Sequence, residues 1–256
     1  MANILDRYGI KEVADVTFYA LDTNEKPTYP VLYLDTLKVS TIEQTAEEAT
    51  ASGGKGNAPL IVWDYGKEIT VTLEDALFSP KSLAIMFGDA DGINSNATTQ
   101  VIRKTVHKSQ IDANGGVTIN GKRIVPTTDS DKGTGLFYYN AKGESVQGTS
   151  EEAVYAVLVF QPKEIQTIDV SANSFPGTYY VTGDTYARNE ANGVDEFFQF
   201  IVPKAKVQSE NTITMEADGD PSVFNMSLKV LRPKDGVMMK LVKYDVDNTP
   251  VSGSDD

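Results

Sequence analysis

The stretch KEITVTLEDAL, residues 67–77, decides the fold class of this 256-residue chain. Ile69, Val71 and Leu73 alternate with polar residues, so a strand built from them has one apolar and one polar face. The same alternation recurs in DVTFYAL, residues 15–21. Short strands of this kind follow one another without helix-length segments between them. This pattern is typical of a mainly β fold, an antiparallel sandwich or barrel, and not of βαβ units.

Turn residues indicate how these strands pair. Asn192-Gly193 separates two strand-like runs, and an Asn-Gly pair accepts the positive φ angles of a type I′ hairpin turn. We therefore expect a long hairpin around this pair. Two further candidate turns are Asn120-Gly121, which predicts a shorter hairpin, and Asp235-Gly236, which predicts a hairpin between the last two strands.

One segment, FSPKSLAIMFGD (residues 78–89), breaks the β pattern. Ser79 can cap a helix, and Pro80 has a φ that already suits the first helical position. Gly88 can adopt the left-handed conformation that often follows the last helical residue. We expect one short helix of about two turns that flanks the sheet.

Three stretches depart from the strand pattern within what we expect to be a single domain, residues 1–256. Residues 41–59, TIEQTAEEATASGGKGNAP, hold almost no core-forming side chains, which predicts a long loop between two strands that is either functional or disordered in the isolated chain. Residues 89–150 are rich in Asn, Gly, Thr and Ser and are expected to form an insertion with a small sheet of its own. Residues 246–256 are expected to be a flexible C-terminal tail.

The chain is acidic, with 36 Asp and Glu against 23 Lys and Arg and a formal net charge of −13. This balance argues against a protein that reads nucleic acid, because such proteins need an excess of cations on one face. The absence of Cys excludes disulfides, thiolate catalysis and Cys-based zinc sites. No apolar window is long enough to span a membrane, so no membrane insertion is expected.

The sequence offers no convincing catalytic, cofactor or metal site. His107, the single histidine, has no nucleophile or carboxylate at a recognisable spacing. Residues 89–96 and 217–221 are rich in Asp and Asn, but neither has the ligand spacing of a calcium loop. The Gly-rich residues 53–59 lack the Lys-Ser/Thr pair of a phosphate-binding loop. We therefore assign no catalytic, cofactor-binding or metal-binding residues and expect that the protein is not an enzyme.

Aromatic residues leave one alternative open. Trp63 and Tyr65, together with Tyr179, Tyr180 and Tyr186, could form a platform on which a sugar stacks. Aromatic residues in strands are more often core residues or cross-strand partners. A carbohydrate- or receptor-binding β-sandwich is therefore an alternative function.

Three runs of sequence resemble the tail tube proteins, also called major tail proteins, of tailed bacteriophages. They are GNAPLIVWDYGKEITVTLEDALFSPKSLAIMFG (residues 56–88), FPGTYYVTGDTYARNEANGVDEFFQFIVPKAKV (residues 175–207) and NTITMEADGDPSVFNMSLKVL (residues 211–231). The order of the strands, the short helix and the hairpins carry the resemblance. Another tail component or a head decoration protein is the alternative within the virion.

The resemblance implies a structural virion protein. Hexameric rings, whose inner strands form a continuous barrel, would stack into a tail tube that conducts DNA into the host during ejection. The implied partners are further copies of the chain, a tape-measure protein, tail terminator and baseplate or tip proteins, and a sheath protein. DNA would be a cargo that does not adhere. The implied location is the tail of the virion, after assembly in the host cytoplasm.

This family picture assigns roles to three sets of residues. An inter-ring loop would contain Glu47, Glu48, Gly53, Gly54, Lys55 and Gly56. An inter-subunit strand edge would contain Phe198 and Phe200, because an uncovered antiparallel edge invites pairing with another chain. Acids that repel the phosphates of passing DNA would be Glu68, Glu74, Glu196 and Glu210.

Overall fold

The computed structural model describes residues 7–89, 100–162, 164–210, 212–213 and 223–244. The expected C-terminal tail, residues 246–256, lies outside this range, as do most of residues 89–96 and all of residues 217–221.

The chain divides into two compact units: residues 1–93 together with 168–256, and residues 94–167. The second unit contains most of the expected insertion, but it ends at residue 167 instead of near residue 150. The reason is that the strand Tyr155–Phe160 pairs within this unit. Because the second unit has its own buried apolar cluster, it is a separate compact body within what the sequence suggested was one domain.

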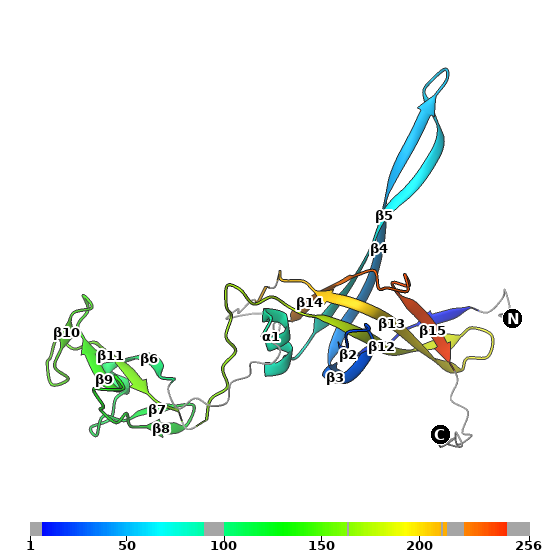
Figure 1. Ribbon diagram of the computed structural model, residues 1–256. Coiled ribbons are helices and arrows are strands. Elements are labelled where there is room, and N and C mark those ends of the chain that lie inside the picture. Colours follow the sequence, from blue (N-terminus) through cyan, green and yellow to red (C-terminus); the bar gives the residue numbers. More distant parts are fainter. Residues whose placement is uncertain (1–6, 90–99, 163, 211, 214–222, 245–256) are drawn as a thin grey trace. The chain divides into compact units, whose positions relative to one another are not determined.

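The first unit is built on a nine-stranded antiparallel sheet in the order β3-β2-β12-β13-β14-β5-β4, with β1 paired to β12 and β15 paired to β13 (Figure 1). The strands are β1 (Tyr8–Ile10), β2 (Asp15–Leu21), β3 (Pro27–Leu34), β4 (Leu37–Gly53), β5 (Ala58–Asp75), β12 (Thr178–Asn189), β13 (Asp195–Val207), β14 (Phe224–Val230) and β15 (Lys240–Tyr244). In the described part of the chain β3 and β4 do not pair with each other. The sandwich-type antiparallel fold is therefore confirmed, and a single chain does not close the sheet into a barrel.

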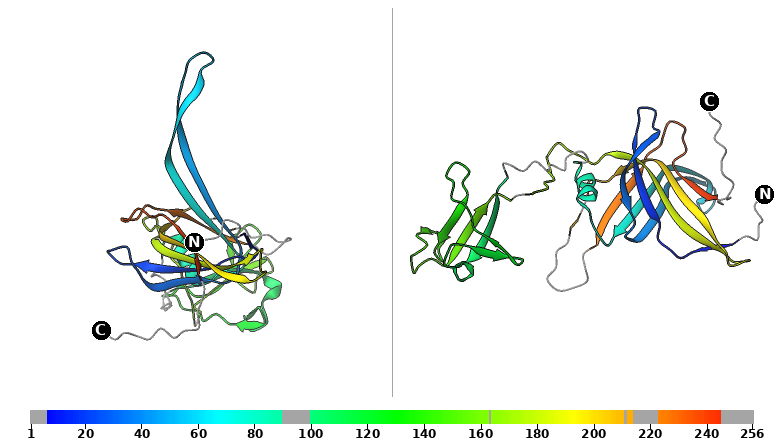
Figure 2. Two further views of the ribbon diagram at one scale, coloured as in Figure 1. Left: turned by 90° about the vertical axis from the view of Figure 1, so that its right-hand side faces the viewer. Right: turned by 90° about the horizontal axis from the view of Figure 1, so that it is seen from below.

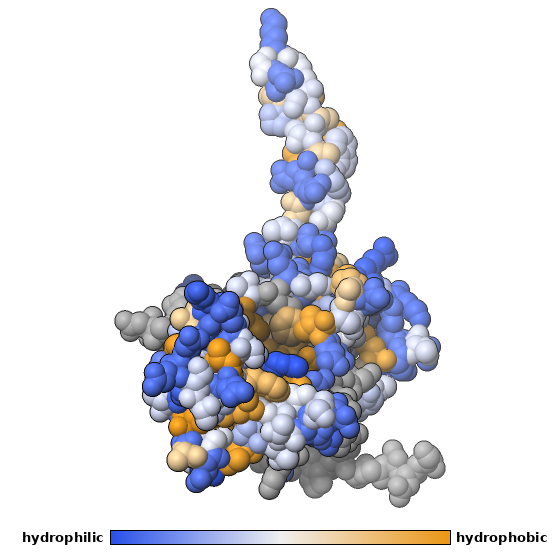
Figure 3. Space-filling model, turned by 90° about the vertical axis from the view of Figure 1, so that its left-hand side faces the viewer, coloured by the Kyte–Doolittle hydropathy of each residue, from blue (hydrophilic) through white to orange (hydrophobic). Residues whose placement is uncertain are grey.

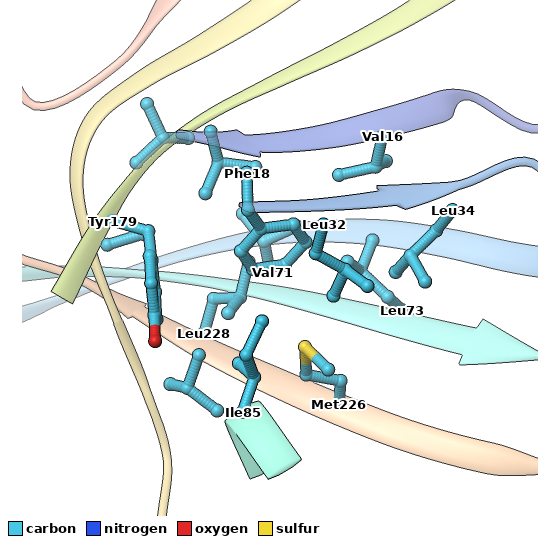
Figure 4. Packing of buried hydrophobic residues seen from close by; sticks show 14 of the residues in the cluster. Val16, Phe18, Leu32, Leu34, Val71, Leu73, Ile85, Tyr179, Met226 and Leu228 are labelled. Carbon is cyan, nitrogen blue, oxygen red and sulfur yellow. The ribbon is translucent and has the colours of Figure 1, made fainter. Parts of the chain in front are cut away.

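The sheet curls around one apolar core. Val16 and Phe18 of β2, Val71 and Leu73 of β5, and Leu228 of β14 are fully buried there, and Figure 4 shows their side chains pointing toward one another. Each buried strand residue is followed by a partly exposed one, as the alternation in the sequence predicts.

The helix α1 (Pro80–Phe87) is confirmed with both of its caps. The backbone N–H of Ser82 donates to Ser79 Oγ (3.0 Å), and the Ser79 N–H donates to Ser82 Oγ (2.9 Å). Gly88 follows in the left-handed conformation, with φ 83°. Ile85 packs into the core of the sheet (Figure 4). No helix of the described residues is long and apolar enough to cross a membrane.

The chain leaves the first unit directly after α1 and returns close to the same point. The Asp169 N–H donates to Asp89 Oδ2 (3.1 Å), and Ser174 Oγ donates to the carbonyl oxygen of Gly88 (2.6 Å). Gly88 also approaches Phe175 so closely that a Cβ built on it would lie 2.5 Å from the carbonyl carbon of Phe175. Residues 88–89 and 169–175 are thus fastened together.

Two of the three predicted hairpins are confirmed. Asn120 (φ 48°) and Gly121 (φ 75°) form the two-residue turn between β7 (Val117–Ile119) and β8 (Lys122–Ile124). The β12–β13 hairpin also forms, but residues 190–194 connect its strands and only Gly193 has a positive φ in this loop, so the turn is longer than a type I′ turn.

The third predicted hairpin is wrong. A turn does form at Gly236, whose N–H donates to the Pro233 carbonyl oxygen (3.1 Å), but the strands on either side do not pair with each other. Both lie along the same edge of β13: β14 pairs with residues 205–207 and β15 pairs with residues 197–201. The long β13 strand offers more edge than β14 covers, and β15 takes the remaining part.

The second unit contains a four-stranded antiparallel sheet in the order β10-β9-β11-β6 and the separate β7–β8 hairpin. Its elements are β6 (Ile102–His107), the 3₁₀ turn η1 (Lys108–Gln110), β7 (Val117–Ile119), β8 (Lys122–Ile124), β9 (Gly135–Tyr139), β10 (Ser145–Val146) and β11 (Tyr155–Phe160). Val106, Val117, Ala156 and Leu158 form its core. Arg123 binds Asp112 through Nε (2.5 Å) and Nη2 (3.0 Å), and this hydrogen bonding lowers the pKa of Asp112.

Candidate assembly surfaces

A long two-stranded hairpin extends from the first unit. The predicted loop at residues 41–59 is in fact mostly strand: β4 continues to Gly53, β5 begins at Ala58, and residues 54–57 form the turn. The polar composition of this segment does not prevent strand formation, because hydrogen bonds between two strands pair the backbone groups whatever the side chains are. The apolar LIVWDY run on the partner strand also has a high β propensity and favours pairing.

We call residues 46–66 the arm. Within the described chain β14 accompanies β5 only along residues 70–75, so the arm is a bare strand pair. Figures 1 and 2 show it extending away from the sheet of the first unit. The expected inter-ring residues all lie on it: Glu47, Glu48 and Gly53 in β4, and Gly54, Lys55 and Gly56 in the turn at its tip.

One face of the arm is apolar. Residues that pair directly share a face of the strand pair, and the pairs on this face are Glu47 with Tyr65, Ala49 with Trp63, and Ala51 with Ile61. Trp63 and Tyr65 each keep 53% of their surface exposed. In Figure 3 orange atoms lie among blue and white ones along the arm. Trp63 therefore lies opposite a small alanine and Tyr65 lies opposite Glu47, and both aromatic side chains are outside the core.

The opposite face of the arm has a different character. It carries the pairs Glu48 with Asp64 and Thr50 with Val62. Glu48 and Asp64 lie side by side on this face, next to Val62, which is 51% exposed. The arm therefore carries its aromatic side chains on one face and its paired carboxylates on the other.

The predicted strand edge at Phe198 and Phe200 is not free. Phe198 pairs with Lys243 and Phe200 pairs with Leu241, because β15 covers this part of β13. On the other side β12 covers the same residues. An inter-subunit ladder at these two positions would require β15 to leave, which corrects the expectation of an uncovered edge.

Glu196, one of the predicted acids of the bore, belongs instead to an ion-paired cluster that we call the terminal clamp. It pairs with Lys243 of β15, and the hydrogen bond from Lys243 lowers the pKa of Glu196. Lys243 Nζ also donates to Tyr8 Oη (2.6 Å), and Asn189 Nδ2 donates to the same oxygen (3.2 Å). The clamp thus fastens β1 and β15, the first and last described strands, to the β12–β13 hairpin.

Glu68 and Glu74 lie together on the side of β5 that faces away from the core. The ladder partners of this side extend it across β4 and β14. We call the resulting surface the polar face; its residues are Val39, Thr41, Glu43, Thr45, Glu68, Thr70, Thr72, Glu74, Asn225, Ser227 and Lys229. All except Val39, which pairs with Glu74, are polar, and most are short. Lys229 forms an ion pair with Glu68. Glu43 was missed by the sequence reading, because its position opposite Thr70 depends on the register of the two strands.

Glu210 has no place on this surface. It is exposed and lies beyond the end of β13 at Val207. Of the four predicted acids, therefore, Glu68 and Glu74 are the two that share the polar face.

His107 has a local structural role. Its Nδ1 atom lies 2.8 Å from Ser109 Oγ and caps the 3₁₀ turn η1, and its ring meets that of Tyr155 edge to face. Among the described residues no three Asp, Glu or His side chains are grouped as a metal site would require.

Comparison with known proteins agrees with the resemblance read from the sequence. The sequence model of the YomU/Tube protein family matches residues 8–243. A tail tube protein of Bacillus phage SPR is 24% identical to this chain over 224 residues, which cover 81% of this chain and 78% of the relative. Since the family match includes both units and nearly all described strands, the chain belongs to the YomU/Tube protein family.

Proposed function

We propose that this protein is the structural subunit of a bacteriophage tail tube, in which hexameric rings stack and conduct DNA during ejection. The observation that carries the proposal is the arm. A bare two-stranded hairpin is marginally stable in water, and this one exposes Ile61, Trp63 and Tyr65 on one face. Such a surface gains stability when further copies of the chain cover it.

The polar face is proposed to line the bore. Glu43, Glu68 and Glu74 outnumber Lys229 on it, so it repels phosphates, and its short Thr and Ser side chains offer nothing for DNA to stack on. The charge of the chain supports this role. The unit with the nine-stranded sheet carries 29 acidic and 15 basic residues. Residues 94–167 carry seven acidic and eight basic residues. The acidic excess therefore belongs to the unit that would form the tube wall.

The proposal extends to the partners and location of the assembled tube. A tape-measure protein would occupy the bore during assembly, terminator and baseplate or tip proteins would cover the two ends, and a sheath protein would surround the tube in a contractile tail. Assembly would take place in the host cytoplasm and the product would be part of the virion tail. The role is structural and requires no catalytic residue.

Electron microscopy of the purified protein tests the ring and tube. We expect hollow cylinders or hexameric rings. In one variant Asn-Gly replaces residues 48–64. The pair Glu47–Tyr65 is then the last pair of the hairpin, and the Asn-Gly turn that follows it is favourable. We expect this variant to fold and to remain without tubes. A control variant that replaces only the turn at residues 54–57 with Asn-Gly should still assemble. Normal tubes from the first variant would contradict the proposed role of the arm.

The bore is tested by charge reversal. Glu43→Lys with Glu74→Lys should give tubes that retain short double-stranded DNA in a salt-dependent manner, because added cations bind phosphates and release counterions. Glu151→Lys with Glu152→Lys makes the same charge change on exposed residues of the second unit and is the matched control. Equal DNA retention by the two variants would exclude the polar face as the lining of the bore.

A further inference from the structure

The mouth of the core in the first unit is a groove that the described part of the chain leaves open. It has a volume of about 450 Å³ and is lined by Ile10, Val13, Ile42, Phe198, Phe200 and Leu241, among others. Ile10 and Leu241 expose 59% and 57% of their surface. These residues come from β1, β4, β13, β15 and the segment before β2, so the terminal clamp holds two of the walls in place.

The rim of the groove is positively charged. Lys11 and Lys38 line it, with Glu12 as the acid among the lining residues. Neither lysine forms an ion pair with any residue that the structure describes. A complementary partner therefore presents an apolar surface flanked by carboxylates.

We propose that this partner is the arm of a second copy of the chain, with Trp63 and Ile61 seated in the groove. The inference rests on the proposed tube function. The apolar face of the arm carries Glu47 beside its aromatic residues, and the opposite face adds Glu48 and Asp64. Apolar anchors thus meet an apolar groove, and acids meet Lys11 and Lys38 at its rim. This is the arrangement of a buried hot spot inside a charged rim.

The arm of the same chain cannot occupy its own groove. Ile42, in the wall of the groove, pairs with Val71, and the ladder continues from there to Trp63 with only local bulges. At roughly 3.3 Å per residue, Trp63 lies about 27 Å from Val71 along a strand pair that points away from the sheet. The arm and the groove are therefore two different patches of one surface. Contacts between different patches of identical subunits can continue from copy to copy instead of closing on a dimer, as a growing tube requires.

Trp63 is the single tryptophan of the chain and reports directly on this contact. On tube formation its fluorescence emission should shift to shorter wavelengths, and acrylamide should quench it less. Leu241→Asp in the groove should abolish both changes together with assembly. Val170→Asp, which alters a residue of the same unit that is 66% exposed and does not line the groove, should leave both unchanged. A Trp63 that stays exposed in assembled tubes would overturn the proposal.

Cysteine cross-linking identifies the acceptor, because the chain has no Cys of its own. Protein with Ala49→Cys is mixed with protein carrying Ile10→Cys, assembled and oxidised. We expect a mixed disulfide between the two proteins. Thr50→Cys, on the opposite face of the arm, is the matched control and should give none.

The outcomes separate the two proposals. Equal cross-linking of Ala49→Cys and Thr50→Cys, or no cross-linking in tubes that assemble, would remove the groove as acceptor and leave the tube function intact. If the unsubstituted protein forms neither rings nor tubes, both proposals fail.

Discussion

Gly183 of β12 lies directly opposite Phe200 of β13, and the aromatic ring covers it. A Cβ built on Gly183 would lie 2.0 Å from Phe200 Cε1 and 2.2 Å from Cζ. Phe200 is only 5% exposed and lines the groove described above, so its ring can avoid an added methyl group only by moving from its packed position toward the groove. The φ of Gly183 lies outside the left-handed region, so alanine is sterically allowed by the backbone and the ring alone opposes it.

We expect Gly183→Ala to destabilise the first unit by about 1–3 kcal/mol, the usual cost of adding a methyl group to a packed core. For a unit of this size the melting temperature should fall by about 2–4 °C per kcal/mol. Gly9→Ala is the control, since Gly9 also lies in a strand and a Cβ there meets no atom within 4 Å. This control should be neutral or slightly stabilising.

A double-mutant cycle makes the reasoning refutable. Phe200→Ala alone should cost about 3–5 kcal/mol because it leaves a cavity. In that background the clash is gone, so Gly183→Ala should stabilise by about 0.5–1 kcal/mol through the reduced entropy of the unfolded chain. The sign of the glycine substitution therefore inverts, and the coupling can be measured by urea unfolding together with hydrogen exchange of the β12 and β13 amides. An effect of the same sign and size in both backgrounds would show that the ring does not cover Gly183.

Three further substitutions or conditions give expected outcomes. Gly88→Ala should cost more than the roughly 1–2 kcal/mol of a left-handed alanine, because its Cβ would also collide with the Phe175 backbone; thermal unfolding measures this, and an unchanged melting temperature would contradict it. Ser79→Ala should cost about 0.5–2 kcal/mol by removing the cap of α1, and Ser79→Asp should restore most of the loss, again by thermal unfolding. The hydrogen bond from Lys204 (2.7 Å) lowers the pKa of Glu25 from 4.5. That contribution is present above about pH 4.5 and is lost as the pH falls through the lowered pKa, so Glu25→Gln should reduce the acid sensitivity of the melting temperature.

Local features of this fold could be predicted from the sequence, and long-range ones could not. The alternation around Val71 and the caps of α1 depend on residues within one strand or one turn, so their patterns are legible along the chain. The pairing of β15 with β13 depends on how much edge another strand leaves uncovered, and no local pattern records that. The residues around Gly236 therefore predict the turn correctly, but they do not show that the strands on either side of it pair with β13 and not with each other.

The candidate surfaces follow the same division. Trp63 and Tyr65 could be recognised in the sequence as residues of a strand. Their exposure follows from the arm itself, beside which no third strand lies among the residues that the structure describes. Glu68 and Glu74 were identified together because they share the period of one strand. The ion pair of Glu196 could not be predicted, because its partner Lys243 is distant in the sequence and meets it only through β15.

The fastening of residues 88–89 to residues 169–175 has an evolutionary consequence. Hydrogen bonds within the first unit hold residues 88–89 next to residues 169–175. The positions of α1 and β12 therefore do not depend on the segment of chain that connects these residues. A segment held at both ends in this way is exchangeable. Relatives could carry shorter, longer or unrelated modules at this position, and an engineer could graft a foreign domain there and display one copy on every subunit.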